Sequence, residues 1–305
     1  MRRRRYITFL IGGIALLVAG QALAKVRIKG WYFPKPFTMS SPMSPHRFGG
    51  METAVNFTDL GTGMAFPLRS AIAPRKSPFA VDLTLPLSIG IPKDGSAEFY
   101  LGNPSISVTG AWRFMFPVGG NQRLPSAWSA GADIGLPLAG IWGANAATVL
   151  CFPMYVREYS AWLPHFVIRP KVTLALGKPI FFGMFELGIA GLGVTMSGDT
   201  YTVMDWGVAL GSQPHEMVSI TLEFGGAHAL HDDSFTVFSH NPVWGALGAR
   251  FYIGEKFVAG LMMRVPFTHA FADQLHSLVP DVPTNESIFA FSIFVGYQVK
   301  EHPGF

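Results

Sequence analysis

The sequence contains a single cysteine, few charged residues and, beyond its first two dozen positions, no long apolar run. Cys151 has no partner for an internal disulfide, and we expect it to be a small buried or lipid-facing apolar residue. Charged residues make up 14% of the chain and aromatic residues 13%, a balance too apolar for an ordinary secreted enzyme. A helix needs about 20 apolar residues to cross a bilayer. No apolar run in the main part of the chain is that long, so no membrane-spanning helix is expected there.

The N-terminus has the three parts of a secretory signal. Residues 2–5 are arginines, residues 6–19 are almost wholly apolar, and Ala22-Leu23-Ala24 is a small-x-small cleavage site. The apolar run is too short for an uncleaved anchor, so we expect residues 1–24 to be removed after Sec-type export. This takes away four of the 23 basic residues and none of the 19 acidic ones, leaving 19 of each. The basic pI is therefore a property of the signal, and no nucleic-acid binding is expected.

Apolar and polar residues alternate with a period of two in ten stretches of the remaining chain, which predicts β-strands. These stretches are 81–91, 105–118, 128–139, 165–177, 180–194, 201–211, 217–228, 243–253, 257–267 and 287–299. In all of them one phase is free of charge. The other phase carries Asp82, Arg113, Asp133, Arg169, Lys171, Glu186, Asp205, Glu223, Arg250 and Arg264. A soluble sandwich places its charges outside, whereas here the uncharged phase must face outward.

This pattern predicts an all-β protein, an antiparallel up-and-down transmembrane barrel in the outer membrane of a Gram-negative cell. We expect residues 80–305 to form ten strands in contact with outer-membrane lipid. The predicted outer connections, 92–104, 140–164, 195–200, 229–242 and 268–286, are mostly longer than the inner ones, 119–127, 178–179, 212–216 and 254–256, as in known barrels. Residues 25–79 are a plug, a periplasmic extension or one extra hairpin formed by 51–60 and 63–73. The hairpin would raise the count to twelve strands.

Two segments resemble known outer-membrane barrels. The last strand places Phe289, Phe291, Ile293, Val295 and Tyr297 on one face, which resembles the C-terminal signal that engages the barrel assembly machinery. In that family the strand usually ends in an aromatic residue, where this chain has Val299. The run 101–104, Leu-Gly-Asn-Pro, before the strand with Ala-Trp-Arg-Phe at 111–114, is similar to Gly-rich strand entries of barrels grouped as transporters of aromatic compounds.

The ten inward charges, five acidic and five basic, are the predicted lumen-lining residues. They fit a narrow channel or passive transporter for small or moderately hydrophobic solutes, and their balance argues against strong ion selectivity. They equally fit a closed structural or adhesive barrel in which the charges pair with one another and the extracellular loops act. A third hypothesis is an outer-membrane lipid hydrolase using Ser239, His240 and Asn241, but neighbours in sequence point in different directions. We therefore expect no enzyme and no catalytic residues.

Two further polar clusters lie in predicted outer loops. His269, Asp273 and His276 would share a helical face and include plausible zinc ligands, but without a fourth ligand a solvated amphipathic face is the better interpretation. The run from His228 to Asp233 has the polar composition of a loop tip. No metal or other cofactor is predicted.

Overall fold

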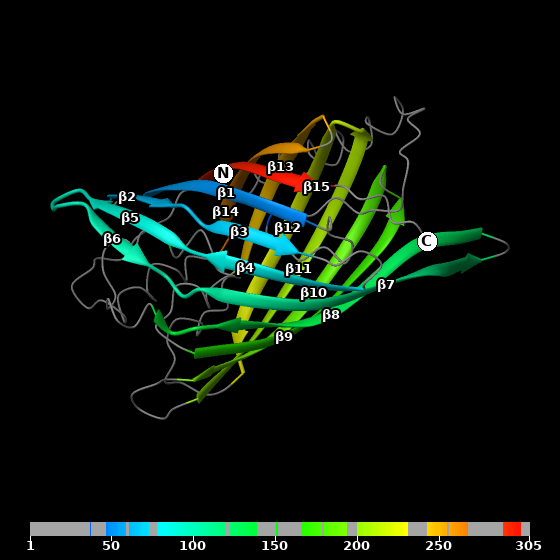
Figure 1. Cartoon of the computed structure of the whole chain (residues 1–305), viewed down its shortest axis with the longest axis horizontal. Helices are drawn as coiled ribbons and strands as arrows, with labels where there is room; N and C mark the ends of the chain where they lie inside the picture. The colour runs from blue at the N-terminus through cyan, green and yellow to red at the C-terminus, as the bar shows by residue number, and fades with distance from the viewer. Residues whose placement is uncertain are drawn as a thin grey trace, which may run out of the picture.

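The computed structural model describes residues 37, 47–58, 61–72, 78–119, 122–138, 151, 166–178, 180–193, 200–230, 243–254, 256–267 and 289–299. They form one antiparallel sheet that closes into a barrel where β1 pairs with β15 (Figure 1). The strands are β1 (Arg47–Thr58), β2 (Gly61–Ala65), β3 (Leu68–Ile72), β4 (Phe79–Leu85), β5 (Leu87–Pro92), β6 (Glu98–Leu101), β7 (Ser105–Gly119), β8 (Gln122–Gly135), β9 (Phe166–Lys178), β10 (Phe181–Gly193), β11 (Thr200–His215), β12 (Val218–Ala229), β13 (Val243–Ile253), β14 (Phe257–Pro266) and β15 (Phe289–Val299). The predicted signal, residues 1–24, lies outside the described residues.

These fifteen strands make twelve crossings of the wall, because β2 and β3, β4 and β5, and β6 and β7 are interrupted halves of single crossings. Ala65↔Ser88 and Leu68↔Leu85 keep one register on both sides of the first two breaks, which puts Pro67 opposite Pro86. Proline has no N–H to donate, so the ladder is broken there. The Pro86 carbonyl still accepts a bond from the Gly102 N–H, at 2.9 Å.

The prediction of ten strands is therefore wrong, and the twelve-strand alternative is the one observed. Residues 47–72 form the extra hairpin, in which β1 pairs with β2 and β3. Its alternation is weak in the sequence because several inward positions, Gly50, Ala54, Gly63 and Ala65, are small rather than polar. Three predicted boundaries are also wrong. The 92–104 connection contains β6, most of the 119–127 connection is the first half of β8, and most of the 212–216 connection is the end of β11.

The outer surface of the wall is apolar, as the phase assignment predicts. Large exposed side chains such as Ile134, Ile168 and Val172 lie on the uncharged phase, with 38%, 47% and 52% of their surface exposed. Near the end of the barrel that carries the short turns, which we call the short-turn end, Trp112 stacks on Trp128 with ring centroids 4.4 Å apart. Such aromatic residues are typical of the girdle at a membrane interface. No helix among the described residues is long and apolar enough to cross a membrane.

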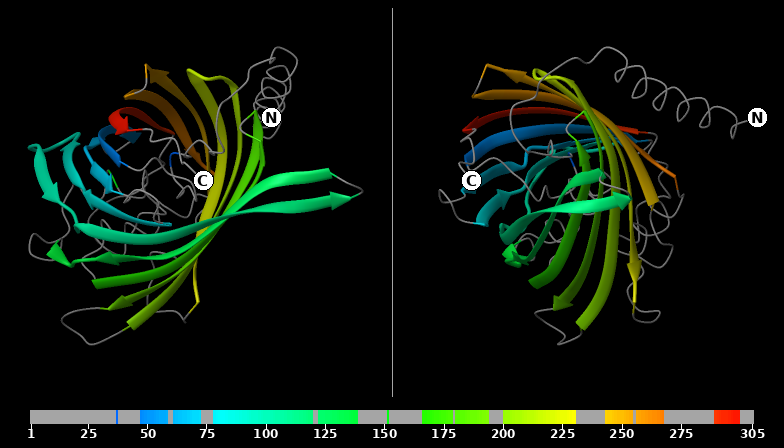
Figure 2. Two further views of the ribbon diagram at one scale, coloured as in Figure 1. Left: turned by 45° about the vertical axis from the view of Figure 1, so that its right-hand side comes forward. Right: turned by 90° about the vertical axis from the view of Figure 1, so that its right-hand side faces the viewer.

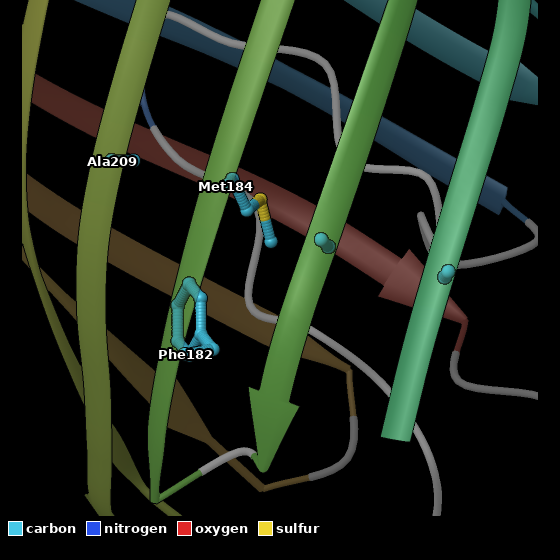
Figure 3. Packing of buried hydrophobic residues seen from close by; sticks show 5 residues of the cluster. Phe182, Met184 and Ala209 are labelled. Carbon is cyan, nitrogen blue, oxygen red and sulfur yellow. The ribbon is translucent and has the colours of Figure 1, made fainter. Parts of the chain in front are cut away.

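A small apolar cluster lies inside the wall, towards the short-turn end (Figure 3). Phe182 and Met184 project from β10 and pack near Ala209 of β11, with Ala127 and Ala175 completing the cluster. Gly211 leaves room for the Phe182 ring, because a Cβ there would overlap it. The strands also differ in length at this end. Figure 2 shows that β7 and β8 extend together beyond their neighbours.

Candidate functional site

All ten predicted lumen-lining residues lie on the inward phase of the strands. Arg169, Lys171, Glu186, Asp205, Glu223 and Arg264 are buried, whereas Asp82, Arg113, Asp133 and Arg250 are partly exposed. The hairpin of residues 47–72 adds two more inward charges, Glu52 and Arg69, which form an ion pair at 3.4 Å. This pair was not predicted, because residues 25–79 were left open between a plug, a periplasmic extension and a hairpin. The charges of Glu52 and Arg69, each among small or apolar inward residues, were the available signal.

Five of the charged residues form a connected group around Arg169, which we call the Arg169 cluster. The Arg169 guanidinium contacts carboxylates from three other strands: Asp133 on β8 through Nη1 at 2.6 Å, Glu186 on β10 through Nη2 at 3.1 Å, and Asp205 on β11 through Nε at 2.6 Å. Lys171 Nζ completes the cluster, 2.6 Å from the other Asp133 oxygen. The cluster has three carboxylates and two cations.

Neutral hydroxyl groups extend this network. Lys171 Nζ donates to Ser107 Oγ at 3.0 Å, which connects the cluster to β7. Thr173 Oγ1 donates to Glu186 Oε2 at 3.0 Å. Buried carboxylates are costly unless their oxygens receive such bonds, so the arrangement keeps this part of the wall in one conformation.

Gly188 on β10 makes the centre of the Arg169 cluster possible. A Cβ at this position would lie 2.6 Å from Arg169 Nε and 2.9 Å from Cζ. The guanidinium therefore lies directly over the glycine backbone and crosses β10 to reach β11. A larger residue at 188 would have to displace the guanidinium.

A second group surrounds Phe37, which lies outside the strands of the wall. The Phe37 N–H donates to Glu223 Oε1 at 2.7 Å, and the same oxygen accepts from Thr221 Oγ1 at 2.9 Å. The Arg250 guanidinium lies over the Phe37 ring, 4.3 Å from its centroid, a cation–π contact. The ring also lies close to the backbone at Gly248, where an added Cβ would be 2.4 Å away.

We call this second group the Phe37 cluster and include the charges on the neighbouring strands. Its members are Phe37, Glu52, Arg69, Glu223, Arg250 and Arg264. Arg250 is also 5.5 Å from the ring centroid of Phe294 on β15, and Arg264 is 5.1 Å from that of Trp244 on β13. The cluster has three cations and two carboxylates.

The two clusters occupy separate arcs of the closed wall. The Arg169 cluster spans the contiguous strands β8 to β11, and the Phe37 cluster spans β12 to β15 with β1 and β3. Ion pairs connect the charges of the first arc, and the second contains the Arg69–Glu52 pair and the ring contacts of Arg250 and Arg264. The excess charge of one is negative in the first arc and positive in the second. Asp82 on β4 and Arg113 on β7 lie between the arcs and outside both clusters.

The inward side chains are small but well covered. Of the 22 buried apolar residues described, ten are alanines, including Ala127 and Ala175 with no exposed surface. The interior of an 8-stranded barrel is just filled by its own side chains, so a 12-stranded wall lined by alanine needs atoms from elsewhere to cover it. Phe37 and Cys151, both buried, are two described residues outside the wall. Cys151 Sγ lies 3.9 Å from the Ile89 carbonyl oxygen of β5.

The other predicted sites are only partly within the described residues. Ser239, His240 and Asn241 lie outside them, as do His269, Asp273, His276 and the run 231–233. His228 is described, on the outward phase of β12, where it accepts a hydrogen bond from Trp206 Nε1 at 2.9 Å. Among the described residues, no three His, Cys, Asp or Glu side chains are grouped as metal ligands.

No known protein-family model matches the chain, and no curated protein is detectably similar in sequence. Solved structures are similar in fold. The COG4313 outer membrane channel from Pseudomonas putida F1 superimposes with a TM-score of 0.55 at 8% identity, covering 90% of this chain and 99% of the channel. The NanC porin and a KdgM porin in complex with disordered oligogalacturonate match with TM-scores of 0.47 and 0.44, at 8% and 6% identity. Each match covers 82% of this chain, with 100% of NanC and 98% of KdgM. The protein has the fold of outer-membrane β-barrels.

Proposed function

We propose that the protein is a narrow passive channel of the outer membrane, for small solutes of neutral or moderately hydrophobic character. The observation that carries the proposal is the lining of the wall: ten of the 22 buried apolar residues inside the twelve crossings are alanines, beside charged side chains and a few large ones such as Phe182 and Trp244. A purely structural barrel of this width would be expected to fill its own interior with large side chains. The COG4313 outer membrane channel, which shares the fold, supports the same role.

We further propose that the segment carrying Phe37 is a plug that holds the channel in a closed state. Phe37 contacts two residues of the wall. Its backbone N–H donates a hydrogen bond to Glu223, and its ring makes a cation–π contact with Arg250. Such contacts can be broken without unfolding a strand. The barrel could then open while its hydrogen-bonded wall stays intact.

The two arcs suggest the class of solute. An acidic and a basic arc of nearly equal strength create a field across the lumen rather than along it. A field of this kind orients dipolar molecules but does not accumulate ions of one sign, for which a ring of like charges is needed. Uncharged or zwitterionic solutes should therefore pass better than simple ions of either sign.

Single-channel recording in planar bilayers tests the proposal. We expect rare openings for the unaltered protein and a much higher open probability for Phe37→Ala, which removes the ring from Arg250. The matched control is Phe267→Ala, which removes an aromatic ring that is 48% exposed on the outward side. Inserted, folded barrels that stay silent in all three proteins would contradict the channel and favour a closed barrel acting through its loops.

A further inference from the structure

The β7–β8 hairpin projects as an arm from the short-turn end of the barrel (Figures 1 and 2). Strand β4 pairs with β7 only as far as Gly110, and β9 pairs with β8 only from Ser126 onward. Residues 114–119 and 122–125, which we call the arm, therefore pair with each other but with no further strand among the described residues. Short turns lie on the periplasmic side of outer-membrane barrels, so the arm is on that side.

The β7 strand of the arm is apolar on both of its faces. In the wall, the inward phase of β7 carries polar residues up to Arg113, but in the arm the same phase continues with Met115 and Pro117. The outward phase continues with Phe114, Phe116 and Val118, which are 36%, 46% and 59% exposed. Exposed apolar residues clustered in this way mark an interaction surface.

One face of the arm is continuous with the lipid-facing surface of the barrel. Phe79, at the start of β4, packs edge-on against Trp112, which stacks on Trp128. These three rings form an aromatic row at the short-turn end. Phe114, Phe116 and Val118 share their phase with Trp112 on β7, and Leu124 shares its phase with Trp128 on β8. The arm thus extends the apolar outer surface of the barrel wall.

The open edges of the arm are unsuited to pairing with a second copy of the chain. A free strand edge is a template for another strand through its outward N–H and C=O groups. Each arm strand carries a proline, Pro117 and Pro125, and the two strands remain paired past both, with a register shift between Pro117 and Gly119. This is the arrangement expected when the missing N–H would have pointed to the open edge. The prolines therefore remove donors from both edges, which also lowers the cost of placing the arm against lipid.

The charge of the arm is also of one sign. Arg123 is exposed and lies on the face opposite to Phe116 and Val118, and the described arm residues include no Asp or Glu. With the aromatic face in the acyl boundary, Arg123 would point towards the lipid phosphates. This is the distribution seen in segments that lie in the membrane interface.

We propose that the arm docks onto the periplasmic leaflet of the membrane as an interfacial anchor, with its Phe114–Val118 face among the acyl chains and Arg123 at the phosphates. The proposal is independent of whether the barrel conducts. Its ligand is the phospholipid of that leaflet, and a periplasmic protein is the competing occupant.

Spin labelling in vesicles of phosphatidylethanolamine and phosphatidylglycerol tests the anchor. In a Cys151→Ala background, a nitroxide is attached at Val118→Cys or Leu124→Cys on the proposed lipid face, or at Pro117→Cys on the opposite face. Reference labels are Ile134→Cys, on the lipid-facing wall, and Met217→Cys, in a turn at the same end and 50% exposed. Collision with O2 reports lipid contact, and collision with a water-soluble nickel chelate reports water.

We expect labels at 118 and 124 to show the O2 preference of the Ile134 label, with several-fold less nickel collision than the Met217 label. The label at 117 should be intermediate. Equal nickel collision at 117, 118, 124 and 217 would overturn the proposal, because purified protein in vesicles offers no other occupant. In that case cross-linking from the same cysteines in intact cells would be the test for a periplasmic protein. Labels at 118 and 124 perturb different strands, so a folding defect in one leaves the other informative.

Discussion

Arg169 on β9 forms a two-point ion pair with Asp205 on β11, although β10 lies between these strands. The pair exists because Gly188 of β10 has no side chain where the guanidinium crosses. Three neighbouring strands are thus joined by side chains as well as by their backbone ladder. The geometry of the acidic arc therefore depends on a glycine that makes no polar contact through a side chain.

Replacing that glycine should weaken the barrel. Gly188→Ala places a Cβ within 2.6 Å of Arg169 Nε, and we expect it to cost about 1 to 3 kcal/mol, the usual range for overpacking. The measurement is the free energy of unfolding in denaturant, followed by tryptophan fluorescence of the lipid-embedded protein. Gly183→Ala is the control on the same strand, since the nearest atom to its Cβ is a Leu210 methyl at 3.9 Å. Equal losses for both variants would contradict the role of Gly188.

Removing the central cation should cost more than crowding it. Arg169→Met leaves three carboxylates with Lys171 alone, and we expect a loss of about 3 to 5 kcal/mol, as for other broken buried ion pairs. Lys256→Met in the exposed turn between β13 and β14 is the charge-matched control and should change the unfolding free energy of the barrel by no more than about 0.5 kcal/mol. A small effect at 169 would mean that the cluster is hydrated rather than buried.

The face assignment predicts opposite outcomes at two adjacent positions. Leu83 is outward and 46% exposed, whereas Thr84 is inward and half-buried. Leu83→Arg should destabilise the barrel by about 2 to 4 kcal/mol if it lies near the middle of the membrane. Thr84→Arg should cost clearly less, because its charge stays inside the barrel. The measurement is the free energy of unfolding of both variants. A larger loss for Thr84→Arg than for Leu83→Arg would reverse the assignment of the two faces.

The Cys151 thiol should be unreactive in the folded protein. Burial raises the pKa of this thiol, so the thiolate that reacts with maleimides or disulfide reagents is suppressed in the folded state. The folded pKa is above the unfolded one, so Cys151 should lower stability only as the pH rises above the unfolded pKa, about 8.5. We expect labelling at pH 8 only after denaturation. Rapid labelling of folded protein would show that residue 151 is accessible.

The parts of the fold that the sequence predicted are those where side-chain chemistry alternates strongly. In β9, Arg169 and Lys171 alternate with Ile168 and Val172, so both the strand and its orientation follow from the pattern. The first hairpin has this contrast at few positions, because Gly50 and Ala54, on the inward phase with Glu52, are no more polar than Val55 on the other phase. The ten-strand count failed for that reason.

Two other features depend on contacts that no local pattern contains. Arg169 and Asp205 are 36 residues apart, and only the strand order brings their atoms together. The position of Phe37 against Glu223 connects residues 186 apart in the chain.

The arm was missed for a different reason. Pro117 and Pro125 lie in β7 and β8 but look like turn residues, although both are compatible with an open strand edge.

The seam between β1 and β15 also determines the order in which the interior can form. The Arg169 cluster draws its members from residues 133 to 205, so its contacts need neither the first strand nor the last four. The Phe37 cluster needs both β1 and the strands after β11, and it is complete only when the last strand meets the first across Glu52 and Phe294. Contacts of such long sequence separation form slowly. The acidic arc therefore rests on contacts of shorter sequence separation, whereas the basic arc around Phe37 is complete only when the barrel is closed.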